Sequence, residues 1–107
     1  MFTPGDPAEV EAVVPVMVHT PGTCYLRLGR GGEPTLHTTP IENYRLGQGL
    51  TLRTGTDIAL LSAGGILTQT VSAAEKLAER GISAEVVSFP TLKPIDRELI
   101  LSLGQRF

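Results

Sequence analysis

The sequence predicts an α/β protein, and three patterns in its second half indicate that class. Residues 57–63 form a nearly continuous apolar run, which is typical of a strand covered on both faces of a sheet. Residues 66–80 carry apolar side chains at helical spacing, and residues 84–89 form a second strand-like run. Strand, helix and strand in this order predict a crossover unit that joins two parallel strands.

Composition narrows the class of function. The chain has 107 residues, a net charge of -2 and a hydrophobic fraction of 41%, which suits one small globular unit. There is no basic stripe for nucleic acid, no apolar run near the roughly 20 residues that span a bilayer, and no signal-peptide pattern. The single cysteine, Cys24, cannot form an internal disulfide. We therefore expect a cytoplasmic protein in which Cys24 is a small buried apolar residue.

The first element is expected to be a helix. Asp6 can cap its first turn, Pro7 suits the first helical position, and Glu9 stands where a capping box places a carboxylate. Pro21-Gly22 ends it. Its apolar face is expected to comprise Val10, Val13, Val14, Met17 and Val18.

A short strand over residues 24–28 is expected next, with Tyr25 and Arg27 on the side opposite Leu26. Residues 31–50 contain glycines, prolines and few apolar anchors, so they are predicted to be a connector between two domains. An edge strand is expected to begin near Leu50.

The second half continues through recognisable caps. Gly64-Gly65 makes the turn into the helix over residues 66–80. Gly81 is expected to end that helix in a left-handed conformation, with Ile82 folding back as in a Schellman motif. Asp96 is expected to cap a last helix, which carries Leu99, Ile100 and Leu103.

Three segments together resemble the transketolase family, which includes transketolases and 1-deoxyxylulose-5-phosphate synthases. The first is the helix start around Asp6 followed by residues 21–30, PGTCYLRLGR, which resemble the last helix and last strand of the family's pyrimidine-binding domain. Residues 55–64, GTDIALLSAG, with the helix after them, are similar to the opening of its C-terminal domain. Residues 81–87 and the corner TLKPID at 91–96 resemble the next strand and its lysine-proline-x-aspartate corner.

The resemblance implies a domain organisation. Residues 1–30 would be the end of a parallel-sheet pyrimidine-binding domain, residues 31–50 an interdomain connector, and residues 51–107 the start of a three-layer α/β C-terminal domain. The parent enzyme would use thiamine diphosphate and Mg²⁺ to transfer two-carbon ketol or acyl units between sugar phosphates or 2-oxo acids. Partners would be a cofactor-binding N-terminal subunit, or the rest of the enzyme, in a homo- or hetero-oligomer.

Two family features do not occur in this sequence. One is the Gly-Asp-Gly motif, with its downstream asparagine, that holds the diphosphate and magnesium. The other is the glutamate that activates the cofactor, which lies earlier in the pyrimidine-binding domain than residue 1, so neither Glu9 nor Glu11 takes that role. We therefore assign this chain no catalytic, cofactor-binding or metal-binding residue and expect it to be inactive alone.

Arg30 is the first candidate site residue. It follows Leu28 and the flexible Gly29, at the rim where open α/β folds bind ligands. A guanidinium fork matches phosphate oxygens. The resemblance implies that Arg30 contacts the phosphate of a sugar-phosphate substrate, and the alternative is a solvated arginine in a glycine-rich loop.

Arg27 is the second candidate, and it has two interpretations. It lies inside the expected strand, where a charge is costly unless it is paired. It is either a structural ion pair with a carboxylate or a second phosphate ligand beside Arg30.

The remaining polar residues are interpreted as structural. Gly64-Gly65 could cradle an anion but is better explained as a tight turn. Asp57 is expected to pair locally, and Lys93 and Asp96 to form a corner and a helix cap. His19 and His37 have no second histidine, cysteine or acidic residue at metal-ligand spacing.

Two other functions stay open. One is a non-catalytic docking or oligomerisation module, because exposed sheet edges favour pairing with another chain. The other is an independent nucleotide-binding domain that uses Gly64-Gly65.

Overall fold

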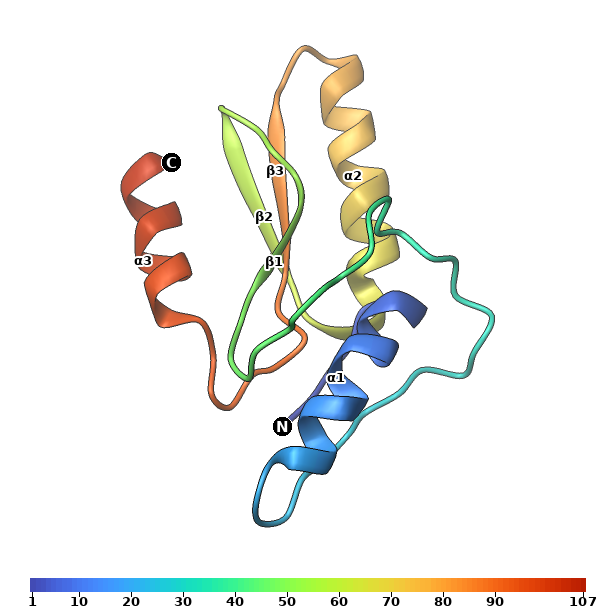
Figure 1. Ribbon diagram of the computed structural model, residues 1–107. Helices are drawn as coiled ribbons and strands as arrows, with labels where there is room; N and C mark the ends of the chain where they lie inside the picture. The colour runs from blue at the N-terminus through green and yellow to red at the C-terminus, as the bar shows by residue number, and fades with distance from the viewer.

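The computed structural model describes all 107 residues, and it contains three helices and three strands joined by long ordered segments (Figure 1). In chain order they are α1 (Pro7–His19), β1 (Leu50–Arg53), β2 (Ile58–Ser62), α2 (Leu67–Glu79), β3 (Ala84–Ser88) and α3 (Arg97–Arg106). A 3₁₀ turn, η1 (Gly64–Ile66), leads into α2. No helix of this set combines the length and the hydropathy that crossing a membrane requires.

The sheet has the order β1-β3-β2. β2 pairs with β3 in parallel, in a register that runs from Ile58 opposite Ala84 to Ser62 opposite Ser88. β1 pairs with β3 antiparallel and has an irregularity between Thr51 and Arg53. The α/β class, the crossover unit and the edge strand near residue 50 are therefore confirmed.

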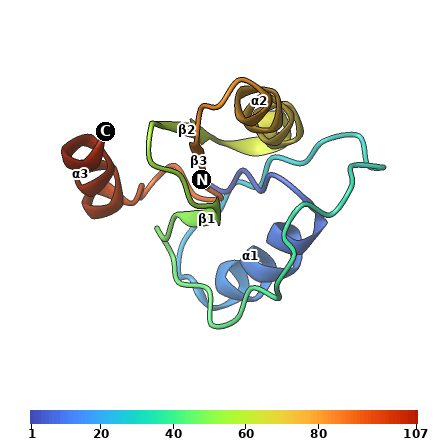
Figure 2. The ribbon, with the colours of Figure 1, turned by 90° about the horizontal axis from the view of Figure 1, so that it is seen from above.

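α2 and α3 lie on opposite sides of this sheet (Figures 1 and 2). The period of two in β3 explains how, since Ala84 and Val86 pack against Leu67 and Ala74 around α2, while Val87 packs with Leu103 of α3. All five residues of β3 are buried. The central strand is thus covered by one helix on each face.

β2 does not have the environment that its apolar run predicts. It is an edge strand, and Ile58 and Leu61 remain 41% and 45% exposed. Leu60 packs toward α2 and Ala59 toward α3, so both faces of β2 meet a helix, but the cover predicted for residues 57–63 is incomplete at this edge strand. The central position belongs to β3 instead.

α1 begins as predicted, but it buries a different side. Asp6 is its N-cap and accepts a hydrogen bond from the Glu9 amide at 2.8 Å. The predicted apolar face is wrong at Val14 and Val18, which are 42% and 75% exposed, whereas Glu9 and Val13 are fully buried. Hydrogen bonds compensate the burial of Glu9, so hydrophobicity alone did not decide which side of α1 faces inward.

The predicted strand over residues 24–28 is also wrong. A single bridge joins Leu26 to Phe2, and no regular strand forms there. Phe2 is followed within two residues by Pro4, which has no amide hydrogen to continue the pairing. Leu28, which a strand would place on the same side as the half-buried Leu26, is 54% exposed.

The ends of α2 and α3 use glycine in different ways. Gly81 has φ +79°, its amide donates to Ala78 O, and the Ile82 amide donates to Leu77 O, so the Schellman motif after α2 is confirmed. α3, in contrast, runs through Gly104 to Arg106. A helix tolerates one glycine at a cost of about 1 kcal/mol.

The N-terminal segment crosses the carboxyl ends of β2 and β3. The Thr3 amide donates to Pro90 O at 2.6 Å, and Thr3 O accepts from the Gly64 amide at 3.0 Å. Phe2 forms a second bridge, to Thr91. Residues from the two ends of the chain therefore meet at the edge of the sheet where open α/β folds bind ligands.

Candidate functional site

Two cavities lie beside the N-terminal segment at this edge of the sheet. They share four lining residues, which belong to that segment, to the loop after residue 27 and to the turn before α2. These are Pro4, Leu28, Gly29 and Gly65. The chemistry of the two cavities differs, because their remaining walls carry opposite charges.

Arg27 lines the cavity of about 430 Å³, together with Met1, Thr3 and the turn Gly64-Gly65. Its amide donates to Phe2 O at 2.9 Å, which fixes the backbone at this point. Arg27 is exposed and forms no ion pair with a carboxylate, since the two ion pairs of the chain join His37 to Glu9 and Arg106 to Glu85. The guanidinium is thus free to meet an anion in this cavity.

Arg30 lies three residues further along an exposed loop and lines neither of these cavities. It is unpaired as well. Gly31 and Gly32 follow it with φ of +92° and +79°, conformations that favour glycine. The structure therefore brings Arg27, and not Arg30, to the turn before α2.

The second cavity, of about 360 Å³, has acidic walls. Asp6, Glu11 and Glu33 line it and no basic residue does. An anion would meet like charges there, so the Arg27 cavity is the better candidate for a phosphate.

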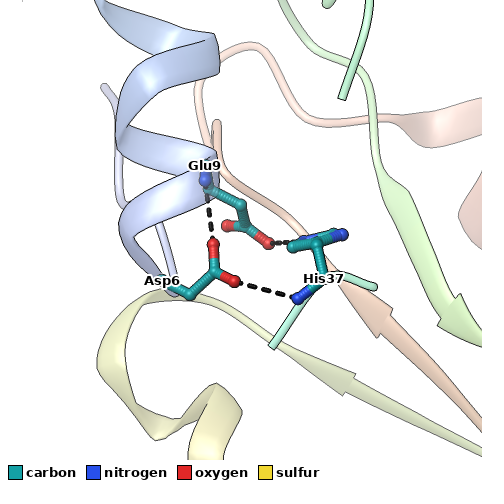
Figure 3. Close-up of side chains that lie close together, drawn as sticks. All are labelled: Asp6, Glu9 and His37. Carbon is teal, nitrogen blue, oxygen red and sulfur yellow. Dashed lines mark hydrogen bonds and ion pairs between the residues drawn. The ribbon is translucent and has the colours of Figure 1, made fainter. Parts of the chain in front are cut away.

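Asp6, Glu9 and His37 form a buried cluster that we call the latch (Figure 3). Glu9 Oε1 and His37 Nε2 lie 2.8 Å apart, and the two side chains are 0% and 8% exposed. Asp6 Oδ2 accepts hydrogen bonds from the amides of Leu36 at 2.7 Å and His37 at 3.1 Å. The latch therefore joins the start of α1 to the segment that precedes β1.

Glu9 also connects the latch to the sheet. Its Oε2 atom accepts from the Gly5 amide at 2.6 Å and from Ser88 Oγ, at the end of β3, at 3.1 Å. In a capping box the Glu9 carboxylate would accept a hydrogen bond from the amide of Asp6. The capping-box prediction is therefore wrong, because the carboxylate has other partners. The carboxylate turns toward Gly5, Ser88 and His37 because each offers a donor where Glu9 is buried.

The latch residues are of types that ligate metals, and their ligand atoms lie within 4.8 Å of one another. Every carboxylate oxygen, however, already has a hydrogen-bonding partner within the protein. A cation would have to displace these donors, so the arrangement fits a structural latch better than a metal site. Sequence reasoning missed it, because 28 residues separate Glu9 from His37 and no local spacing links them.

Tyr44 holds the end of the same segment. Its hydroxyl lies 3.1 Å from Gln48 O and 3.1 Å from Thr91 Oγ1. Burial raises the pKa of Tyr44 above its usual 10.0, the Thr91 hydrogen bond opposes the rise, and the charges of Glu9 and Asp96 add to it. The phenol therefore stays protonated over the physiological range.

A second interaction that the sequence did not reveal joins α3 to β3. Arg106 donates two hydrogen bonds to the buried Glu85 carboxylate, at 2.9 and 3.0 Å. These bonds raise the pKa of Arg106. The pair neutralises a carboxylate that would otherwise be buried alone in the central strand.

The structural interpretations of the other polar residues can be placed directly. Asp57 accepts from the Ser83 amide at 2.7 Å, and Asp96 caps α3 through the Leu99 amide at 3.0 Å while also accepting from Gly49. Lys93 is exposed at the corner before Asp96. Cys24 is half-buried and packs beside the cluster of Phe2, Val13 and Tyr44, and the His19 ring forms a hydrogen bond within its own helix, to Pro15 O.

The fold and the cavities define the class of protein. It is a small α/β unit in which a cavity that suits an anion lies at the carboxyl ends of the parallel strands and is lined in part by the N-terminal segment. Residues 47–106 match the family model for the transketolase C-terminal domain. The chain belongs to the transketolase family.

Similar proteins extend the match to almost the whole chain. The 1-deoxy-D-xylulose-5-phosphate synthase of Prochlorococcus marinus is 36% identical over 108 residues, and an apulose-4-phosphate transketolase subunit of Actinobacillus succinogenes is 34% identical over 102. These alignments cover 99% and 95% of this chain. A solved split-gene transketolase, described as an inactive beta4 tetramer, matches 98% of it with a TM-score of 0.89 and 35% identity.

The chain spans only part of these relatives. It corresponds to 17% of the synthase, 32% of the transketolase subunit and 35% of the solved chain. The resemblance to the transketolase family, drawn from three segments between Asp6 and Asp96, is confirmed by the family match and by these relatives.

Proposed function

We propose that this chain is part of a thiamine-diphosphate-dependent transketolase-family enzyme that transfers a two-carbon ketol or acyl unit between sugar phosphates or 2-oxo acids. Relatives that are named as a transketolase subunit and as a sugar-phosphate synthase support this proposal. The chain is inactive alone, works in the cytoplasm and assembles with a cofactor-binding N-terminal subunit or domain. The similarity to a protein described as a tetramer supports an oligomer.

The single observation that carries the role of this chain is the unpaired Arg27 guanidinium in the cavity beside Gly64-Gly65. The cavity lies at the carboxyl ends of parallel strands, and a guanidinium there can bind a phosphate through two parallel hydrogen bonds. Arg30, further along the same loop, is the second proposed phosphate ligand. We propose that both arginines, Arg27 and Arg30, bind the phosphate group of the substrate.

The chain offers no set of residues for the cofactor itself. The oxygens that could hold magnesium belong to the latch, and each is engaged by an internal donor. We therefore assign the diphosphate, the magnesium and the reacting centre to the partner, and derive no catalytic step from this chain. We also propose that residues 31–50 connect the end of one domain, residues 1–30, to the start of another, residues 51–107.

The test combines the chain with an N-terminal transketolase subunit, thiamine diphosphate and Mg²⁺, and measures turnover of phosphorylated and unphosphorylated ketoses. We expect Arg27→Ala to raise the KM for the phosphorylated ketose at least about tenfold, because a charged hydrogen bond to substrate is lost. The KM for the unphosphorylated ketose should change by less than about twofold. Arg30→Ala is measured in parallel.

Arg80→Ala is the matched control, since Arg80 is an exposed arginine at the end of α2. Equal KM values for Arg27→Ala and Arg80→Ala with the phosphorylated ketose would rule out phosphate binding by Arg27. A loss that is the same for both ketoses would assign Arg27 a structural role.

A docking or oligomerisation module is the second candidate function. It is favoured by the open edge of β2, where Ile58 and Leu61 are partly exposed beside a groove lined by Ala59, Leu60 and Ala73. An unpaired edge of this kind can accept another strand. Complex formation that is unaffected by Arg27→Ala, without any turnover, would support this function over the first.

A further inference from the structure

The loop that carries Arg30 is held between two anchor points. The first is at Leu26 and Arg27, because the Phe2 amide donates to Tyr25 O at 2.8 Å and the Arg27 amide donates to Phe2 O at 2.9 Å. The second is at Leu36 and His37, whose amides both donate to Asp6. Residues 28–35 lie between these anchors, and Arg30 is among them.

The latch supplies the polar contacts of the second anchor, and Leu36 adds apolar packing against the core cluster around Leu67 and Ala74. The two oxygens of the Asp6 carboxylate have different partners: Oδ1 caps α1, and Oδ2 accepts hydrogen bonds from the two loop amides. The His37 ring adds a contact to Glu9 at 2.8 Å, and Glu9 is itself held by Ser88 at the end of β3. The loop thus returns to the first turn of the helix that it left at Thr20.

We infer that the latch is a positioning device, in which His37 and Asp6 hold the Arg30 loop closed at the edge of the sheet. Without the latch, only the apolar contacts of Leu36 and Ile41 would hold the segment that follows residue 28, and the loop would sample more conformations. The use of the closed loop for a phosphate rests on the proposed function. Loop closure itself is a property of this chain without substrate.

Limited digestion of the full chain with trypsin tests the inference, because Arg30 is itself a cleavage site. Cleavage after Arg30 reports opening of the loop, whereas cleavage after Arg53, the last residue of β1, reports unfolding of the sheet. We expect His37→Ala to accelerate cleavage after Arg30 about tenfold relative to cleavage after Arg53, since a buried hydrogen bond to a carboxylate is lost.

Three further variants make the result specific. His37→Gln keeps a donor toward Glu9 and should stay within about twofold of wild type. Asp6→Asn keeps the cap of α1 but places an amide donor against the loop amides, so it should open the loop as His37→Ala does. His19→Ala removes an exposed histidine and should change nothing.

Two outcomes would overturn the inference. One is a parallel rise in cleavage after Arg30 and Arg53 in both His37→Ala and Asp6→Asn, which would mean general destabilisation. The other is unchanged cleavage after Arg30 in both variants. Either outcome is independent of whether Arg27 and Arg30 bind a phosphate, because no substrate is present in this measurement.

Discussion

Single buried polar residues determine how the N-terminal part of this chain sits on the sheet. Glu9 is fully buried, yet it has partners in three different segments, at Gly5, His37 and Ser88. A buried carboxylate that keeps its hydrogen bonds costs far less than one that loses them. The residue therefore fixes the relative placement of α1, the following segment and β3.

Tyr44 gives a pH-dependent prediction at this scale. Its pKa is raised in the folded state by burial, so its contribution to stability is complete below about pH 10 and is lost as the pH rises above the unfolded value of 10.0. We expect Tyr44→Phe to lower the free energy of unfolding by about 1 kcal/mol at pH 7 and to flatten the loss of stability above pH 10.0, the usual pKa of the phenol.

Thermal unfolding at pH 7, 9, 10 and 11 measures both effects. Tyr25→Phe is the control, because Tyr25 is 60% exposed. An identical alkaline loss of stability in wild type and Tyr44→Phe would contradict the assignment to this phenol.

The helices show that local caps are robust while helix interiors are tolerant. Asp6 and Asp96 both cap their helices through the third residue of the first turn, and Gly81 ends α2 in a left-handed conformation. Gly104, in contrast, lies inside α3 with no atom near the position of a Cβ. Gly81 is therefore needed for its backbone conformation, whereas Gly104 only lowers the stability of α3.

Paired alanine substitutions test this difference. We expect Gly81→Ala to destabilise the chain by about 1 kcal/mol, because φ is +79° there and a Cβ is strained in that conformation. Gly104→Ala should stabilise it by about 0.5–1 kcal/mol through helix propensity. Chemical denaturation of both variants measures the signs, and equal signs would refute the explanation.

At the scale of the whole molecule, the sheet has three strands, with β3 in the centre and β1 and β2 at its edges. β3 is enclosed by its neighbours and by α2 and α3, whereas the outer edge of β2 is open. Exposed apolar residues on an open strand edge favour association with another strand. This asymmetry agrees with a chain that spans about a third or less of the relatives it matches.

Leu61→Lys tests the open edge. Because Leu61 is 45% exposed, we expect the isolated chain to change in stability by less than about 0.5 kcal/mol, while its affinity for the partner subunit falls at least about tenfold. Leu101→Lys is the control, since Leu101 is 56% exposed on α3. Isothermal titration calorimetry with the partner subunit measures both affinities. If Leu61→Lys binds as tightly as wild type, the open edge of β2 is not the interface.

Sequence patterns predicted the second half of the chain well and the first half less well. The crossover unit, the Schellman motif at Gly81 and the cap at Asp96 depend on residues that are close in sequence, where periodicity and cap chemistry act. The strand predicted over residues 24–28 failed, because its formation needed a partner strand and Phe2 supplies only one bridge. The candidate arginines were named from sequence, but the cavity beside Arg27 was not.

The amino-acid sequence by itself determined the α/β class, the helix caps, the parallel crossover and the transketolase resemblance, because each follows from local spacing and residue chemistry. Only the tertiary structure decided that β3 is central and β2 an edge, that Glu9 meets His37, and that Arg27 reaches a cavity with Gly64-Gly65. These features depend on contacts between residues that are far apart in the chain. No local preference specifies such contacts, since they form only when the whole chain packs.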